Sequence, residues 1–262
     1  MIPAAGRATR LGPLPFSKPL FPIRVTSGRP GAPAVTVVGA HLLARMRQAG
    51  IGKAYVLVAR GQWDMASYFG DGTAAGVRLA YIAVDATPST VHTLDRAHPF
   101  VEGVPVALGF PDILFRPPDL YSRIIAHQQV TGADVVLAVL PTDRPQRMDM
   151  VDLDAQGTVR DIVIKPQHTT LRFTWTAAVW TPAFTRFLHA FLARAGPDDA
   201  VTHGQWEGRE LFVGDVIRAA LREGMRVEGV TFPEGATLDI GTPEDLARAL
   251  EGAAAFEDDA LP

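Results

Sequence analysis

The sequence contains no cysteine, and it contains very little lysine. The missing thiols exclude disulfide bonds, thiolate catalysis and cysteine-ligated zinc or iron–sulfur sites. Lysine occurs only at positions 18, 53 and 165, while the other basic residues are arginines. The seven histidines form no H-x-x-x-H or H-E-x-x-H pattern, and no serine lies in a G-x-S-x-G motif, so zinc sites and serine hydrolases are not indicated.

An excess of charge of one sign is also missing. The 25 basic and 28 acidic residues of this 262-residue chain give a net charge of −3, which excludes a nucleic-acid binder held mainly by phosphate attraction. No apolar run approaches the roughly 20 residues that cross a bilayer, and Arg7 and Arg10 interrupt any short leader at the N-terminus. We therefore expect a cytoplasmic protein without a membrane or nucleic-acid partner.

Short apolar segments alternate with longer amphipathic ones through much of the chain. Strands are predicted over residues 54–58, 77–82, 104–110 and 134–139, and helices over residues 35–48, 119–129 and 182–194. Nearly continuous apolar strands separated by helices are typical of a parallel sheet that is covered on both faces. The pattern predicts an α/β fold with a mostly parallel sheet.

The second half of the chain changes character. Residues 150–153 and 158–163 are predicted to form a hairpin around Gly157, and a strand follows over residues 175–180. A helix over 211–223, a strand over 225–230 and a last helix from Thr242 complete the pattern, with Thr242 as N-cap and Pro243 at the first helical position. No linker or repeat is visible. We predict one domain over residues 1–252 and a frayed acidic tail over 253–262.

The most informative segment is the N-terminal run from Ile2 to Ile23. Small residues follow a short strand, which leaves backbone N–H groups free to approach phosphate oxygens. Arg10 then supplies a planar, always charged donor, and Lys18 a compact ammonium. The run contains neither the phosphate loop G-x-x-x-x-G-K-[ST] nor the glycine pattern of dinucleotide sites. An ordinary proline-rich surface loop is the alternative interpretation.

The N-terminal run resembles a known signature. Its residues Gly6-Arg7-Ala8-Thr9-Arg10, Pro13, Ser17-Lys18 and Pro22 are similar to G-x-G-T-R-x-x-P followed by [PS]-K-x-x-x-P. That signature belongs to the sugar-1-phosphate nucleotidyltransferases, also called nucleoside-diphosphate-sugar pyrophosphorylases, and the Ser-Lys pair is similar to the glucose-1-phosphate thymidylyltransferases. Ala8 departs from the second glycine. The resemblance implies the Rossmann-like fold of that family, Arg10 and Lys18 as catalytic residues, and nucleotide contacts from Ala4, Ala5, Gly6, Arg7 and Thr9.

Two aspartates extend the resemblance. Asp112 lies in residues 106–115, which are similar to the family's L-G-D-N-I-F, and Asp239 lies in residues 235–246, which are similar to W-x-D-x-G-T-P-E-x-L. A carboxylate at the end of a parallel strand lies where open α/β sheets bind ligands, and oxygen ligands suit Mg²⁺. The resemblance implies that Asp112 and Asp239 hold Mg²⁺ together. For Asp112 alone, a turn or a helix cap is an equal alternative.

The contacts to the base and to the acceptor depart further from the family. Lys165 matches the lysine of the E-K-P motif, which binds the sugar phosphate, but Ile164 replaces the glutamate. Asp149 takes the place of a glycine on the sugar side. Ser89 stands beside Thr90 where the family usually has a glycine near the base. The resemblance thus implies a sugar-phosphate site at Lys165 and Asp149, and base contacts at Ser89 and Thr90.

These motifs together imply a Mg²⁺-dependent transfer of a nucleotidyl group from an NTP to a sugar 1-phosphate, with release of pyrophosphate. The resemblance favours dTTP and glucose 1-phosphate as the substrates, and a homo-oligomer is a further expectation, because the family often forms dimers or tetramers. Two alternatives stay open. One is a non-catalytic homologue that binds nucleotides or sugar nucleotides, and the other is a nucleotidyltransferase for another phosphorylated acceptor, such as phosphocholine.

Overall fold

The computed structural model describes residues 1–6, 12, 14–26, 33–196, 198–252 and 256. One sheet has the strand order β5 (Arg78–Val84), β4 (Lys53–Ala59) and β1 (Ile2–Pro3), and a second contains β6 (Val106–Gly109), β11 (Phe173–Trp180), β8 (Val135–Pro141) and β14 (Val227–Thr231) in that order. Hydrogen bonds of Met1 join the two into one central sheet. The terminal ammonium of Met1 donates to the Ala107 carbonyl at 2.6 Å, and the Gly109 N–H donates to the Met1 carbonyl at 3.1 Å. These two bonds follow the parallel pattern and join β1 to β6.

The strand directions confirm the expected mostly parallel α/β sheet. The pairs β1–β4, β4–β5 and β8–β14 are parallel, whereas β11 runs antiparallel to both β6 and β8. In β8, Val135, Leu137 and Val139 face one core cluster, while Val136, Ala138 and Leu140 face another. This alternation shows that the sheet is buried on both faces.

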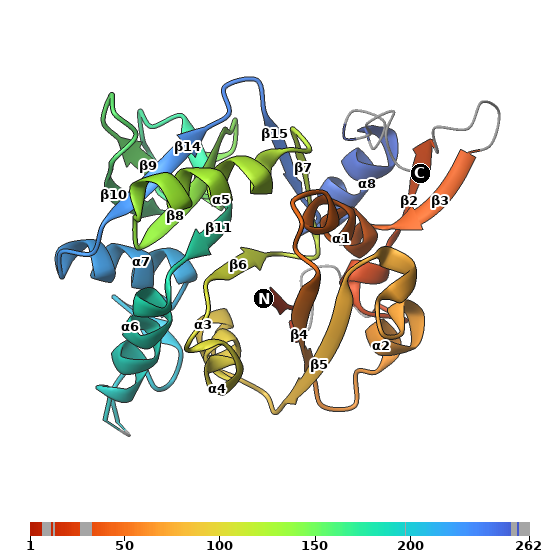
Figure 1. Ribbon diagram of the computed structural model, residues 1–262, viewed down its shortest axis with the longest axis horizontal. Coiled ribbons are helices and arrows are strands. Elements are labelled where there is room, and N and C mark those ends of the chain that lie inside the picture. The colour runs from red at the N-terminus through yellow and green to blue at the C-terminus, as the bar shows by residue number, and fades with distance from the viewer. Residues whose placement is uncertain (7–11, 13, 27–32, 197, 253–255, 257–262) are drawn as a thin grey trace.

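Helices cover the two faces as the sequence pattern predicts. The apolar residues of α1 (Val38–Gln48) and α5 (Leu120–Thr131) contribute to one core cluster, and α5 contacts β8 and β11 (Figure 1). On the other face, the second cluster takes residues from α3 (Thr90–Asp95), α4 (His98–Val101), α6 (Pro182–Ala193) and α7 (Val213–Arg222). The short α2 (Asp64–Phe69) follows β4. The last helix, α8 (Pro243–Gly252), is preceded by the predicted N-cap Thr242, because Thr242 Oγ1 accepts a hydrogen bond from the Asp245 N–H at 3.3 Å. No described helix is long and apolar enough to cross a membrane.

Among the described residues, four antiparallel ribbons complete the fold, and the first of them continues the central sheet, because Met150 pairs with Thr174 of β11. The predicted hairpin is formed by β9 (Asp149–Leu153) and β10 (Val159–Ile164), and Gly157 adopts a φ of 87° in its turn. The hairpin of β2 (Pro22–Thr26) and β3 (Pro33–Val37) lies at the opposite end of the molecule (Figure 1). The third ribbon pairs β7 (Ile113–Arg116) with β15 (Ala236–Asp239), and a small pair joins β12 (Gln205–Trp206) to β13 (Arg209–Glu210).

The start of the first predicted helix was wrong by three residues, and the helix predicted over 211–223 begins at Val213. The helix expected over residues 35–48 begins only at Val38, because residues 35–37 belong to β3 and pair with β2. Two of these three residues are valine and one is threonine, and such β-branched side chains favour an extended backbone where a partner strand is available. The single domain over residues 1–252 stays a prediction, as does the tail, most of which lies outside the described residues.

Close packing at the end of β6 provides a test of the fold. A Cβ atom on Gly109 would lie 2.4 Å from Tyr121 Oη and 2.6 Å from Leu42 Cδ1, so Gly109→Ala should overpack this junction of β6, α5 and α1. We expect a loss of about 1–3 kcal/mol in the free energy of unfolding, measured by urea unfolding. Gly103→Ala is the control, since its Cβ would meet nothing within 4 Å. Equal stability of the two variants would contradict this packing.

Candidate functional site

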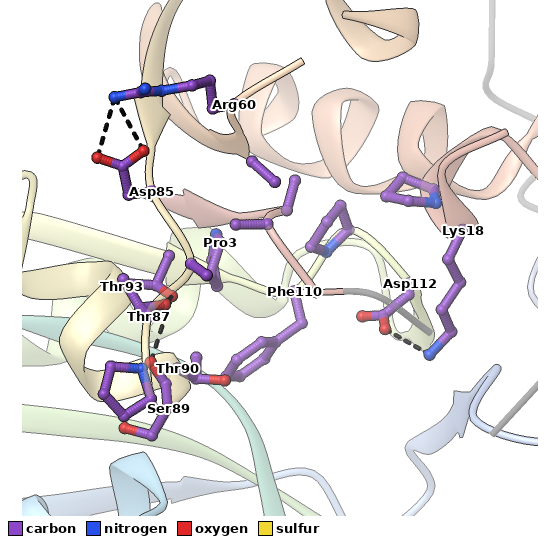
Figure 2. Close-up of a pocket in the computed structure, with 18 of the residues that line it drawn as sticks. Pro3, Lys18, Arg60, Asp85, Thr87, Ser89, Thr90, Thr93, Phe110 and Asp112 are labelled. Carbon is purple, nitrogen blue, oxygen red and sulfur yellow. Dashed lines mark hydrogen bonds and ion pairs between the residues drawn. The ribbon is translucent and has the colours of Figure 1, made fainter. Parts of the chain in front are cut away.

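A cavity of about 690 Å³ opens where β1, β4, β5 and β6 end. It is lined by residues that directly follow these strands, among them Ala4, Ala5, Gly6, Arg60, Asp85 and Asp112, and also by Lys18 and by Ser89 and Thr90 at the start of α3. Figure 2 shows Lys18 and Asp112 at one end of the cavity and Arg60 with Asp85 at the other. The carboxyl ends of parallel strands are the usual ligand-binding edge of such sheets.

The lysine end of the cavity gathers three charged side chains from distant segments. Lys18 Nζ lies 2.5 Å from Asp112 Oδ2 and 3.3 Å from Asp239 Oδ1. The β7–β15 pairing brings the two aspartates together, because Asp239 is the register partner of Ile113, and the Ile240 N–H donates to the Asp112 carbonyl at 3.1 Å. The predicted pairing of Asp112 with Asp239 therefore has a direct backbone cause.

The electrostatic balance of this cluster favours a charged lysine. Burial lowers the pKa of Lys18, whose side chain is only 12% exposed, but the charges and hydrogen bonds of Asp112 and Asp239 outweigh burial and leave the pKa above its ordinary value of 10.5. Two carboxylates thus converge on one cation. Oxygen ligands in this arrangement suit a divalent cation as well as an ammonium group, so the residues present fit Mg²⁺.

The residues expected to contact the nucleotide fall into two groups. Ala4, Ala5 and Gly6 line the cavity after β1, as do Ser89 and Thr90 near its other wall. Ser89 is buried and its hydroxyl lies 2.9 Å from His92 Nδ1. Arg7, Thr9 and Arg10 lie outside the described residues, together with Ala8, so their predicted roles stay predictions.

Lys165 and Asp149 form a second group on the β9–β10 hairpin, separate from the cavity lining as far as the described residues define it. Asp149 is the register partner of Ile164, and Lys165 follows with a φ of 41°. The Lys165 ammonium lies 3.3 Å from the centre of the Phe212 ring, a cation–π contact. The two groups are linked through Trp175, whose ring centre lies 5.9 Å from that of the cavity residue Phe110.

Asp149 is held in an unfavourable environment. No hydrogen bond of ordinary geometry reaches its buried Oδ1 or the buried Nε1 of Trp175, although the Trp175 N–H is close enough to the carboxyl to favour its charged form weakly. Burial raises the pKa of Asp149 to about 6, although the charge of Lys165 opposes the rise. Nearby Asp215 adds to the rise, although Arg209 neutralises much of its charge through a 2.7 Å ion pair. A buried carboxylate with an unsatisfied oxygen is typical of sites where stability is sacrificed for function.

Sequence reasoning missed several residues of the cavity. Arg60 and Asp85 form an exposed ion pair at 2.9 Å, and Glu210 also contributes to the lining. Arg60 and Asp85 follow the strands predicted over residues 54–58 and 77–82, so their place after two parallel strands was the available signal. Glu210 comes from β13, and no pattern in the sequence distinguishes it from a solvated acid.

Comparison with known proteins identifies relatives for almost the whole chain. Residues 1–255 match the profile of the family described as nucleotidyl transferase. The low-salt glycan biosynthesis nucleotidyltransferase Agl11 of Haloferax volcanii is 24% identical over 207 residues, which cover 78% of this chain and 54% of that protein. The bifunctional protein GlmU of Ruegeria pomeroyi is 26% identical over 165 residues, which cover 61% of this chain and 34% of that protein. The chain thus spans about half or less of the length of these curated relatives.

Two solved structures share the fold over nearly their entire length. A putative glucose-1-phosphate thymidylyltransferase from Bacillus anthracis, in complex with a sucrose, superposes with a TM-score of 0.79 at 18% identity and covers 98% of this chain and 95% of its own. A UDP-glucose pyrophosphorylase complexed with UDP-glucose gives a TM-score of 0.75 at 15% identity, with 96% of both chains covered. The expected fold type is therefore confirmed.

The strained carboxyl of Asp149 predicts a stability that depends on pH. Since the pKa of Asp149 is raised in the folded state, the destabilisation is absent below about pH 4 and is complete once the pH exceeds about 6. We expect Asp149→Asn to stabilise the fold at pH 8 by on the order of 2–3 kcal/mol and to have little effect at pH 4. Urea unfolding at both pH values measures this. A gain of the same size at both would show that charge burial is not the cause.

Proposed function

Because this chain belongs to the nucleotidyl transferase family, we propose that it transfers a nucleotidyl group from an NTP to a sugar 1-phosphate and releases pyrophosphate. The observation that carries this proposal is the convergence of Lys18, Asp112 and Asp239 at one end of the 690 Å³ cavity. A triphosphate requires positive charge and backbone donors close together, and a cavity of this size accommodates a small-molecule ligand.

The nucleotide would bind with its phosphates beside Ala4, Ala5 and Gly6, whose small side chains let the backbone come close. Ser89 and Thr90 would then lie toward the base and ribose. Arg10 belongs to the same proposal through its place in the N-terminal signature, where its guanidinium would bind the β- and γ-phosphates.

Asp112 and Asp239 would hold Mg²⁺, because their carboxylates already converge on one cation. When bound, the metal supplies neutralisation of the phosphate charge that builds up during transfer. The ammonium of Lys18 would then contact the α-phosphate instead of the two carboxylates, since the same flexible side chain can reach either group.

The reaction needs no covalent intermediate with the protein. An oxygen of the acceptor phosphate is already ionised at neutral pH and forms the new bond to the α-phosphorus, while the bond from that phosphorus to the bridging oxygen of pyrophosphate breaks in line. Lys18 would offset the charge of the transition state, and Lys165 would bind the phosphate of the acceptor. Catalysis of this type rests on positioning and electrostatic stabilisation.

The identity of both substrates belongs to this proposal. The Ser17-Lys18 pair favours dTTP and glucose 1-phosphate by resemblance. Asp149 and Ile164 change the acceptor side, which keeps another phosphorylated acceptor such as phosphocholine as the second candidate. The arrangement of Lys18 between two carboxylates favours an enzyme over a non-catalytic binding homologue, because binding alone does not require a site for a metal beside the phosphates.

A pyrophosphate-release screen tests the proposed reaction. The common NTPs are crossed with a panel of sugar 1-phosphates and with phosphocholine, each with and without Mg²⁺, and we expect release in at least one Mg²⁺-containing combination. Measurable nucleotide binding without release in any combination would instead support the non-catalytic alternative.

The scarcity of lysine gives a clean test of the role of Lys18. Lys18→Ala removes the charge between Asp112 and Asp239, and we expect kcat/KM to fall about 10²–10³-fold, the usual effect of losing one group that stabilises transition-state charge. Lys53→Ala is the matched control, because Lys53 is exposed at the start of β4. Steady-state kinetics of pyrophosphate release measure both variants. A Lys18→Ala enzyme that matches the Lys53→Ala control would overturn this role.

A further inference from the structure

We propose that Asp64 is a positioning residue of the transfer reaction, which holds the turn at Ser17 so that the Lys18 ammonium reaches the site between Asp112 and Asp239. Asp64 is the first residue of α2 and contacts neither carboxylate of the site, so it would act only through Ser17 and Lys18. Its effect on turnover rests on the proposed function, whereas its effect on Lys18 does not.

Asp64 binds both polar groups of the residue that precedes Lys18. Asp64 Oδ2 accepts from the Ser17 backbone N–H, and Asp64 Oδ1 accepts from the Ser17 hydroxyl at 2.6 Å. Oδ1 also accepts from the Met65 N–H at 2.9 Å, which fixes the carboxylate on the first turn of α2. Hydrogen bonds to an ionised carboxylate are among the stronger ones in proteins.

The surroundings of Ser17 make this contact rigid. Ser17 is only 4% exposed, and Gln62 Nε2 donates to its hydroxyl oxygen at 2.5 Å. The hydroxyl therefore accepts from Gln62 and donates to Asp64, so that both of its roles are satisfied by the segment that leads into α2. A buried, fully satisfied network of this kind fixes one geometry.

The residues after Lys18 are held from the other side. The Leu20 N–H donates to the Ser17 carbonyl at 2.8 Å and the Phe21 N–H to the Lys18 carbonyl at 3.0 Å, which closes a 3₁₀ turn over Lys18–Leu20. Pro19 packs against α1 at Gly39, where a Cβ atom would lie 3.1 Å from the Pro19 carbonyl oxygen. Pro19 holds the end of the turn against α1, and Asp64 holds its start at Ser17. The two contacts together fix the direction in which the Lys18 side chain leaves the turn.

Two roles for Asp64 must be separated by experiment. A structural role would only stabilise the attachment of the turn to α2, whereas a positioning role would also change where the Lys18 ammonium lies. Small displacements of a charged group from its reacting partner cost up to about 10²-fold in rate. The test therefore needs one measurement on turnover and one on Lys18 itself.

The variants are Asp64→Ala, Asp64→Asn and Ser17→Ala, with Asp154→Ala as the matched control. Asp154 also accepts two backbone hydrogen bonds, from Gln156 at 3.0 Å and Thr158 at 2.9 Å, but it lies in the β9–β10 turn. The three lysines are labelled by reductive ¹³C-methylation, and the Lys18 signal is assigned by its loss in a Lys18→Arg protein. The position of this signal is recorded by NMR at one fixed pH, and kcat, KM and urea unfolding are measured on the unlabelled proteins.

We expect Asp64→Ala to lower kcat at least about tenfold and to shift the Lys18 methyl signal away from its parental position, because the ammonium leaves the two carboxylates. Asp64→Asn keeps one acceptor oxygen and should restore part of both properties. Ser17→Ala should lower kcat and shift the Lys18 signal by smaller amounts, because the backbone N–H of residue 17 still binds Asp64. Asp154→Ala should lower the free energy of unfolding and leave kcat and the Lys18 signal unchanged.

An Asp64→Ala protein with the Lys18 methyl signal and the kcat of the parent would overturn the positioning role. If that variant does not fold, the same two measurements on Asp64→Asn and Ser17→Ala decide, and parental values in both overturn it. If no substrate pair is turned over, the proposed function fails separately, while the position of the Lys18 methyl signal still supports or overturns the role of Asp64.

Discussion

The shared contact of Lys18 with Asp112 and Asp239 is the interaction on which the rest of the site depends. Its partners lie 94 and 221 residues from Lys18 along the chain, so it forms only after the N-terminal turn, the β6–β7 segment and β15 have come together. Partly buried charges are stable only when they are paired, and here each sign compensates the other. The β7–β15 ribbon, the 3₁₀ turn after Ser17 and α2 all serve to hold these three side chains at one edge of the sheet.

The charged residues of the site lie in two groups, one at the edge of the parallel strands and one on the β9–β10 hairpin. The Lys18 cluster lies at the carboxyl ends of the parallel strands, where the proposed triphosphate and metal would meet backbone donors and carboxylates together. Asp149 and Lys165 lie on the antiparallel hairpin, where the charge of Lys165 partly offsets the burial of the Asp149 carboxyl and the Lys165 ammonium contacts the Phe212 ring. The bridge from Phe110 to Trp175 joins the two, so that a ligand in the cavity and an acceptor at the hairpin would meet across one aromatic contact.

Much of the fold was predictable from local patterns in the sequence, whereas the site residues were predicted mainly by resemblance to a known family. The parallel sheet and its helices follow from the period of the apolar residues, and the N-cap at Thr242 follows from local chemistry. The proximity of Asp112 and Asp239 was implied by resemblance, and their ligand role stays a prediction. The extended residues 35–37 were missed because their propensity shows only when β2 is present as a partner. Asp64 was missed because an acid at the start of a helix has an ordinary explanation within the helix itself.

The sequence by itself indicated the alternation of the main core strands and helices, the absence of thiol chemistry, and the small number of lysines, two of which lie at the proposed site. These properties depend on composition and on neighbours along the chain. Tertiary structure alone decided that Lys18 lies between two carboxylates, that Asp64 holds the residue before it, and that the carboxyl of Asp149 is buried with a raised pKa. The physical reason is that desolvation and charge pairing depend on which atoms surround a group in space, and those atoms come from segments that no local pattern connects.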